Sequence, residues 1–138
     1  MTRVNLVEPQ ELSDQHLIAE YRELPRCIKQ CIDTTDAPLN YCLGKGHMKW
    51  AKKHSKFLIE RYKKLCAEMR YREFAVNYPA EDLIAYYKKN CKQSDDFDYV
   101  VGFGDFLKSR ARLLQKITQK PNWYKWTKRV CPYKSKRC

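Results

Sequence analysis

The chain has 138 residues, of which 28 are lysine or arginine and 16 are aspartate or glutamate, so its formal net charge is +12. This length suits one compact domain over residues 1–138 with a single core, and it is too short for two. The positive charge predicts a polyanionic partner. No apolar run is as long as a membrane span, and the start lacks a basic-then-hydrophobic pattern, so we expect a cytosolic protein that is neither exported nor held in a membrane.

The positive charge is unevenly distributed along the chain. Residues 1–40 carry four basic and seven acidic side chains, whereas residues 107–138 carry eleven basic side chains and no acidic one. Because the basic residues are concentrated in one part of the sequence, we interpret them as binding nucleic acid rather than as keeping the protein in solution.

The seven cysteines are odd in number and irregularly spaced, which predicts reduced thiols rather than a disulfide framework. The residues that a zinc site would have to use are Cys27, Cys31 and either His47 or His54. The chain has no paired C-x2-C spacing, so we expect neither a metal nor another cofactor. Two further thiols are interpreted as small core residues, Cys66 and Cys91.

The N-terminus supplies a candidate nucleophile. Because the second residue is small, we expect removal of Met1, which leaves the α-amine of Thr2 at the start of the mature chain. An α-amine has a pKa of about 7.7–8.0 against about 10.4 for lysine, so far more of it is neutral at physiological pH. A neutral amine can attack an electrophilic sugar carbon or an aldehyde and form a Schiff base. Thr2 alone is weak evidence, because most chain ends have no chemical role.

A first helix is expected over about 13–32, with Ser13 as its N-cap. Three- and four-residue spacing defines its buried stripe, which consists of Leu17, Tyr21, Leu24, Ile28 and Ile32. Glu23 projects away from this stripe, and Arg22 and Arg26 share another exposed face. A carboxylate beside arginines is unexpected on a surface that only binds a polyanion, so Glu23 is a candidate catalytic residue.

A turn over 33–38 precedes a second helix, which is expected over about 47–70. Helical spacing predicts its inner face, which consists of Ala51, His54, Leu58, Tyr62, Leu65 and Met69. His54 is interpreted as packed at the edge of the core, since packed histidines outnumber functional ones. A short helix begun by a proline is expected over 79–87, and an acidic turn over 94–98.

A third helix is expected over about 105–119, with an inner face of Phe106, Arg110, Leu113, Leu114 and Ile117. A basic ridge with four-residue spacing suits phosphates along one strand, and it comprises Lys108, Arg112, Lys116 and Lys120. Aromatic and cationic residues then alternate over 123–129; from the residues alone, Trp123 and Trp126 could equally stack on bases or cover the core. These patterns predict an all-α single domain of three main helices with an irregular aromatic and basic C-terminal tail.

Three groups of residues occur in order along the chain. The first is Thr2-Arg3-Val4-Asn5-Leu6, Glu11-Leu12, Asp14-Gln15-His16-Leu17 and Ala19-Glu20-Tyr21-Arg22-Glu23-Leu24-Pro25-Arg26; the second is Leu43-Gly44-Lys45-Gly46-His47; the third is Arg112, Lys116-Ile117 and Pro121-Asn122-Trp123-Tyr124-Lys125-Trp126. Together they closely resemble the bacteriophage endonuclease V family, whose members are pyrimidine-dimer DNA glycosylases with an associated abasic-site lyase activity. The connection at 33–41 is shorter and less basic than in the family, and the tail departs from the family pattern after Thr127.

The resemblance implies a monomer that acts on double-stranded DNA containing UV photoproducts or abasic sites. The Thr2 amine would displace the 5′ pyrimidine of the dimer to give an imine, and β-elimination would cleave the strand. Glu23 would stabilise the cationic sugar and assist proton removal. In the family the extruded base is an adenine opposite the dimer. The residues that would contact DNA are Arg3, Arg22, Arg26, His16, Arg112, Lys116, Trp123, Tyr124 and Lys125.

Two other classes remain open from the sequence. A non-catalytic basic DNA-binding protein would explain the charge and the aromatic tail, but not the combination of Thr2 with Glu23. An amidohydrolase with an N-terminal threonine would use the Thr2 hydroxyl instead of its amine, but such enzymes are sandwiches of strands, which the helical patterns do not support.

Overall fold

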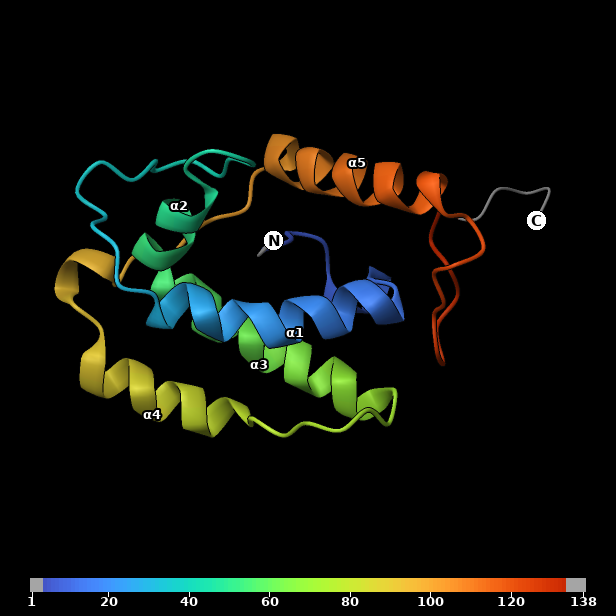
Figure 1. Cartoon of the computed structure of the whole chain (residues 1–138), viewed down its shortest axis with the longest axis horizontal. Coiled ribbons are helices and arrows are strands. Elements are labelled where there is room, and N and C mark those ends of the chain that lie inside the picture. The colour runs from blue at the N-terminus through green and yellow to red at the C-terminus, as the bar shows by residue number, and fades with distance from the viewer. Residues whose placement is uncertain (1–3, 134–138) are drawn as a thin grey trace.

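The computed structural model describes residues 4–133, which form a helical domain (Figure 1). Its α-helices are α1 (Asp14–Lys29), α2 (His47–Lys53), α3 (Ser55–Tyr71), α4 (Ala80–Asn90) and α5 (Phe103–Gln119). Two short 3-10 helices lie in the connections, η1 (Pro9–Glu11) and η2 (Gln93–Asp95). The described residues form no strand, only an isolated bridge between His54 and Asp96. The all-α prediction is therefore confirmed, but this part of the chain has five α-helices where three main ones were expected.

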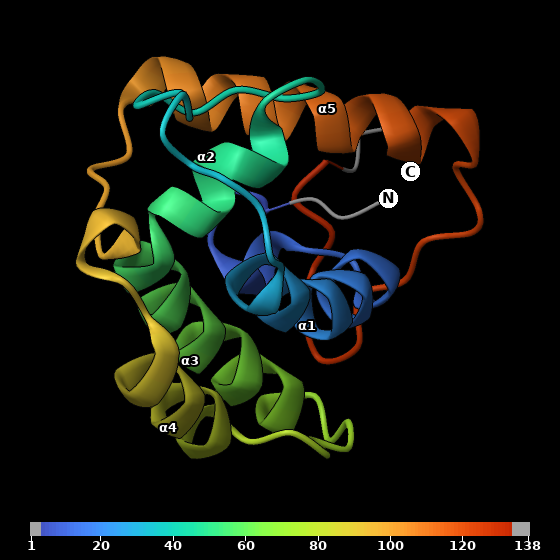
Figure 2. The same ribbon diagram turned by 60° about the vertical axis from the view of Figure 1, so that its left-hand side comes forward.

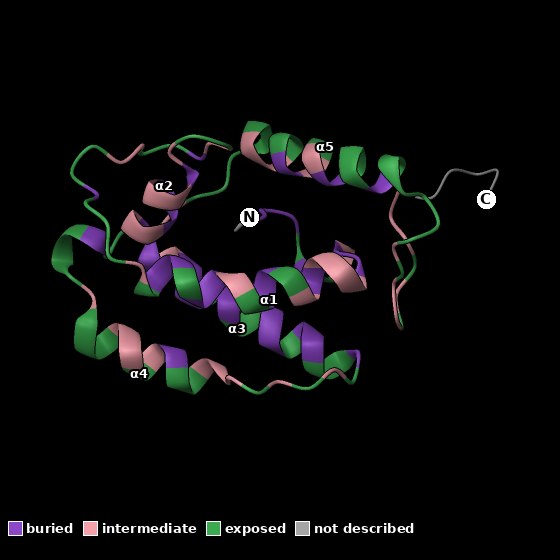
Figure 3. Cartoon of the chain, viewed as in Figure 1, coloured by how far each residue is buried: buried purple, intermediate pink, exposed green. Residues whose placement is uncertain are grey.

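Three helices build the centre of the domain. α1 packs against α3, and α4 packs against α3 as well. α5 lies on the opposite side of α1 from α4, and the segment after the N-terminus runs between α1 and α5 (Figures 1 and 2). The inward faces of α1 and α3 are buried, whereas α5 exposes most of its surface (Figure 3). The basic helix α5 is thus available to a partner along most of its length.

The helix expected over 47–70 is divided into α2 and α3 at His54, whose φ of −101° and ψ of 43° leave the helical range. The backbone of Phe97 causes this break. Its N–H donates to the Lys53 carbonyl (3.2 Å), and its carbonyl accepts from the Phe57 N–H (3.4 Å). In an unbroken helix the Phe57 N–H would donate directly to the Lys53 carbonyl, so Phe97 has been inserted into the hydrogen-bond ladder.

The predicted inner face nevertheless holds across the break. All six residues of that face are buried: Ala51, His54, Leu58, Tyr62, Leu65 and Met69. The ring of His54 stacks on Trp50 with 5.0 Å between centroids, and its Nδ1 lies 2.7 Å from the Trp50 carbonyl. The interpretation of His54 as a packing residue is therefore confirmed.

Helix α1 ends three residues earlier than expected. Gln30 leaves the helix, and its side-chain amide donates to the carbonyls of Cys27 (3.0 Å) and Met48 (2.9 Å), which ties the end of α1 to α2. Ile32 then lies outside the helix and is 36% exposed, so its place in the buried stripe was wrong. The stripe ends at Ile28.

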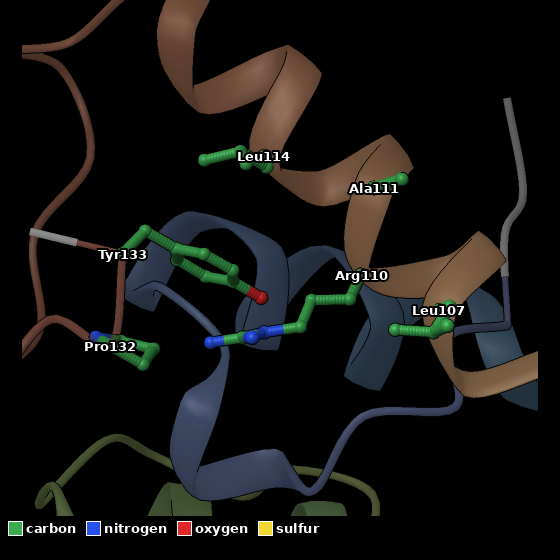
Figure 4. A pocket seen from close by; sticks show the side chains of 6 residues that line it. All are labelled: Leu107, Arg110, Ala111, Leu114, Pro132 and Tyr133. Carbon is green, nitrogen blue, oxygen red and sulfur yellow. The ribbon is translucent and has the colours of Figure 1, made fainter. Parts of the chain in front are cut away.

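Helix α5 begins at Phe103 and ends at Gln119, close to the expected range. Leu113 and Ile117 are buried as predicted, but Leu114 is 41% exposed, which corrects its assignment to the inner face. Leu114 instead lines a groove of about 350 Å³ together with Tyr133 from the tail (Figure 4). Arg110 lies over the Tyr133 ring at 5.0 Å, so this side of α5 is covered by the tail rather than by another helix.

The described residues were also compared with the expectations about membrane spans, cysteines and metal sites. No α-helix within residues 4–133 is long and apolar enough to cross a membrane. Six cysteines in that range carry free thiols, and burial raises the pKa of the Cys27 thiol to about 12. Cys66 is buried as expected, whereas Cys91 is only half-buried, so its assignment to the core was wrong. No group of three or more His, Cys, Asp or Glu side chains in the described range could hold a metal ion.

The turn before α2 depends on two glycines with positive φ, Gly44 (73°) and Gly46 (90°). A Cβ atom at Gly46 would lie 3.0 Å from Cγ of Pro38, whereas at Gly44 it would meet nothing within 4 Å. Gly46→Ala is expected to lower the free energy of unfolding by about 1–3 kcal/mol, since strain and the close contact act together. Gly44→Ala should lose less, about 1 kcal/mol. Urea denaturation measures both losses; an equal loss at the two positions would contradict a specific role for the Pro38 contact.

Candidate active site

Residues 4–7 form an irregular segment that is buried over its whole length. Its first backbone groups are held by side chains rather than by a strand. The Val4 N–H donates to Nε2 of His47 (2.9 Å), and the Val4 carbonyl accepts from the Tyr41 hydroxyl (2.7 Å). Because Nε2 accepts this bond, Nδ1 of His47 carries the proton and donates to the Cys42 carbonyl (2.7 Å). The turn at 43–47 therefore places His47 against the backbone of Val4.

The rest of this segment is fixed from two further helices. The Leu6 N–H donates to Oγ of Ser109 on α5 (2.9 Å), and the Val7 carbonyl accepts from Nη1 of Arg61 on α3 (2.9 Å). Buried backbone groups need such partners, and here they come from elements far apart in the sequence. The position of residues 4–7 is consequently set by contacts from α2, α3, α5 and the residues before α2.

A buried ion pair lies next to this segment. Glu20 on α1 pairs with Nε of Arg61, and its Oε1 also accepts from Nη2 of Arg61 (3.0 Å) and from the side-chain amide of Asn5 (2.8 Å). The Glu20 side chain is 1% exposed and that of Arg61 is 6% exposed. The Glu20 carboxylate is therefore fully engaged by a cation and an amide.

A cavity of about 130 Å³ opens between α1 and α5. Its lining residues come from the N-terminal segment, α1 and α5, and they are Asn5, His16, Ala19, Glu20, Glu23, Arg112 and Lys116. Two carboxylates thus face the cavity one helical turn apart, opposite two cations. The Glu20 side chain is 1% exposed and that of Glu23 is 27% exposed, so Glu23 is the more accessible of the two carboxylates.

Glu23 lies on α1 with its side chain 27% exposed. Nη1 of Arg26 is 3.3 Å from Oε2 of Glu23, but the Arg26 side chain is 72% exposed. Arg22 is exposed as well. An ion pair this open to solvent contributes little to stability, so Arg26 can exchange the carboxylate for a phosphate group. Glu23 thus lies beside an exposed arginine in the structure.

His16 lies in the first turn of α1, where its backbone is capped by Ser13 and its side chain lines the cavity. Its N–H donates to Oγ of Ser13 (3.0 Å), and its Nδ1 lies 2.9 Å from the same hydroxyl. Its ring stacks on Tyr124 with 4.6 Å between centroids. Burial, assisted by the positive charges of Arg112 and Lys116, lowers the pKa of His16 to about 4. The ring is therefore neutral at physiological pH.

The neutral state of His16 gives a test by NMR titration. We expect its ring to become half-protonated near pH 4, and Arg112→Ala to raise this pKa only in part, because burial is the larger cause. Since the pKa in the folded state lies below the ordinary 6.5, the unfolded state takes up a proton first as pH falls. The contribution of His16 to stability is present above pH 6.5 and is lost between there and about pH 4. A midpoint near 6.5 in the folded protein would contradict this environment.

The residues after α5 return to the start of α1. Gln15 joins the two by donating to the Trp123 carbonyl (2.8 Å) and accepting from the Lys125 N–H (3.1 Å). The Asp14 N–H donates to the Lys125 carbonyl (2.7 Å). Trp123 is 58% exposed. The backbone is thus held while the side chains of Trp123 and Lys125 stay exposed.

Trp126 and Thr127 attach this segment to the residues at and before the start of α1. Asp14 accepts from the Thr127 hydroxyl (2.6 Å) and N–H (3.0 Å), and Trp126 donates its indole N–H to the Glu11 carbonyl (3.0 Å). Trp126 is half-buried. Of the two tryptophans that the sequence left ambiguous, Trp126 covers the domain, and Trp123 presents its ring to solvent.

The structure brings together part of the set of residues proposed from the sequence. Those that line one cavity are His16, Glu23, Arg112 and Lys116. Tyr124 contacts this set by stacking its ring on His16. Four further proposed residues are exposed and lie within three positions of Glu23 or Tyr124 in the sequence: Arg22, Arg26, Trp123 and Lys125. Thr2 and Arg3 lie outside the described residues.

Sequence reasoning gave no role to the residues that support the site, Asn5, Glu20, His47, Arg61 and Ser109. Asn5, Glu20 and His47 fall within the runs that carry the resemblance, which was an available signal. Arg61 and Ser109 fall outside those runs. On a helix pattern they look like surface residues, so only the structure reveals them.

The helical domain, the cavity in which Arg112 and Lys116 lie opposite an accessible carboxylate, and the exposed aromatic segment together define a small helical enzyme suited to a polyanionic substrate. A family model described as pyrimidine dimer DNA glycosylase matches residues 1–82, which is more than half of the chain. The chain belongs to this family, and its general role is that of a DNA repair glycosylase acting on pyrimidine dimers. The matched range includes α1, α2 and α3 and ends inside α4, so α5 and the aromatic segment lie beyond it.

Proposed function

We propose that this enzyme cleaves the N-glycosidic bond of the 5′ pyrimidine of a dimer through an imine formed by the α-amine of Thr2. The amine attacks C1′ of the sugar, and the bond from C1′ to the pyrimidine nitrogen breaks. Its electron pair leaves with the pyrimidine, which takes up a proton and stays joined to the 3′ pyrimidine through the cyclobutane ring. Loss of the amine proton and opening of the sugar ring give the imine. Removal of a proton from C2′ then expels the 3′ phosphate by β-elimination, and hydrolysis of the imine frees the enzyme.

The convergence of the pinned N-terminal segment and Glu23 on one cavity is the observation that carries this proposal. Asn5 and Glu23 line the same cavity of about 130 Å³. A chain spans at most about 3.6 Å per residue, so an amine two residues before Val4 is confined to the neighbourhood of the Val4 nitrogen. Such confinement is what raises the effective concentration of a nucleophile.

Charge complementarity supports the remaining roles. A carboxylate at Glu23 stabilises positive charge as it develops on the sugar and can accept the C2′ proton. Arg22 and Arg26 on α1, with Arg112 and Lys116 on α5, would contact phosphates on the two sides of the lesion. The exposed ring of Trp123 and the Tyr124 ring can stack on bases that the kinked duplex exposes.

Cleavage assays on three duplexes test the proposal. The duplexes carry a single thymine dimer, a single abasic site or no lesion. We expect nicking of the first two and none of the third. Cleavage that is indifferent to damage, or absent from all three with Met1 shown by mass spectrometry to be removed, would overturn it. Thr2→Ala should remain active because alanine keeps the α-amine, whereas an enzyme that uses the threonine hydroxyl would lose its activity.

A further inference from the structure

Buried polar side chains beside the cavity form a hydrogen-bonded network that includes two of its lining residues, Asn5 and Glu20. It begins at Asn5, whose amide donates to Glu20 (2.8 Å), and continues to Arg61, which donates to the same oxygen (3.0 Å). Arg61 then returns to the N-terminal segment by donating to the Val7 carbonyl (2.9 Å). This network therefore contacts the N-terminal segment at two points, the Asn5 side chain and the Val7 carbonyl.

The need to satisfy buried backbone groups explains the bond from Arg61 to the Val7 carbonyl, but not the bond from Asn5 to Glu20. The backbone bonds of the segment are made at Val4, Leu6 and Val7, whereas the bond from Asn5 to Glu20 joins two side chains. A buried ion pair is also a costly way to fill a core, because apolar residues of similar volume are often as stabilising or more so. The polar network does, however, fix the orientation of the Asn5 side chain, three positions after Thr2.

We infer that Asn5 and Arg61 are positioning residues which, acting through Glu20, fix where the N-terminal segment delivers the α-amine relative to Glu23. The inference rests on the proposed function, because it concerns the position of that nucleophile. Misplacing a reacting group by about 1 Å can cost on the order of 100-fold in rate, even when binding is unaffected. Loss of the Asn5 amide should therefore slow imine formation without weakening the complex with DNA.

The first variant is Asn5→Ala, with Asn90→Ala as its matched control. Asn90 also donates its side-chain amide within the chain, to the Tyr86 carbonyl (3.0 Å), but it is exposed on α4 and outside the cavity. We measure the rate of borohydride trapping at saturating dimer-containing duplex, together with the Kd. Asn5→Ala is expected to trap roughly 10- to 100-fold more slowly with a Kd near that of the wild type, and Asn90→Ala to match the wild type in both.

Ser109→Ala provides a second route that does not alter the lining of the cavity. It removes the acceptor of the Leu6 N–H and so loosens the same segment from α5, and it serves if Asn5→Ala fails to fold. Amide hydrogen exchange at Val4 and Leu6 reports directly on whether the segment has been loosened. We expect faster exchange at these amides, slower trapping and an unchanged Kd.

Each outcome separates the two proposals. Normal trapping rates in variants whose Val4 and Leu6 amides exchange faster would overturn the positioning role and leave the proposed function intact. A matched loss of trapping and of DNA affinity would also overturn it, because the residues would then act on binding. Absence of any trapped adduct in the wild-type enzyme would overturn the proposed function itself, and the positioning role with it.

Discussion

Glu23→Gln is expected to lower the rate of strand cleavage roughly 10²- to 10⁴-fold while leaving the affinity for a dimer-containing duplex close to that of the wild type. The substitution preserves the size of the side chain and removes its charge. Arg112 and Lys116 still line the cavity in the variant, so the contacts that attract phosphate remain. Single-turnover cleavage measures the rate, and fluorescence anisotropy measures the Kd.

Glu60→Gln is the matched control for this change. Glu60 pairs with Lys63 three residues later (2.6 Å), as Glu23 pairs with Arg26, but it lies on the exposed side of α3 away from the cavity. The control should cleave at the wild-type rate. Full activity of Glu23→Gln would show that the carboxylate has no part in the reaction, whereas a large loss of affinity would assign Glu23 to binding.

Arg61→Met is expected to lower the free energy of unfolding by about 3–5 kcal/mol, because it leaves the buried carboxylate of Glu20 without its cation. Glu20 is only 1% exposed, so its carboxylate depends on the guanidinium rather than on solvent for its countercharge. The Val7 carbonyl loses its partner in the same change. Urea denaturation monitored by circular dichroism measures the loss.

Lys63→Met serves as the control on the same helix. The side chains of Lys63 and Glu60 are 49% and 60% exposed, and an ion pair at that exposure contributes about 0–1 kcal/mol. Replacing both buried partners, Glu20→Leu with Arg61→Met, should recover part of the stability that Arg61→Met loses, because no uncompensated charge remains. A stability of Arg61→Met equal to that of the Lys63→Met control would contradict the burial of this pair.

The helices followed from local patterns, and the failures came from contacts that a local pattern does not contain. The spacing of Leu58, Tyr62 and Leu65 depends only on the helical period, and these residues are buried as predicted. The break at His54 arises from Phe97, which is distant in the sequence and replaces a bond of the helix with its own backbone. The residues next to His54 in the sequence therefore do not predict the break.

The site shows the same division. Glu23 could be singled out because an acid among exposed arginines is anomalous within one helix. The pair of Glu20 with Arg61 could not, because charged residues in amphipathic helices normally face water, and the complementary partner lies on another helix. Likewise, the hydrogen bond from the Trp126 indole to the Glu11 carbonyl depends on how the tail packs against the start of α1. The alternation of aromatic and cationic residues in the tail does not determine that packing.

The most direct test of an N-terminal nucleophile is to trap the intermediate with borohydride on a dimer-containing duplex and on an undamaged one, and to map the adduct by mass spectrometry. We expect a damage-dependent adduct on the α-amine of Thr2. An adduct on a lysine, or no adduct from protein that cleaves the damaged duplex, would contradict imine formation by this amine.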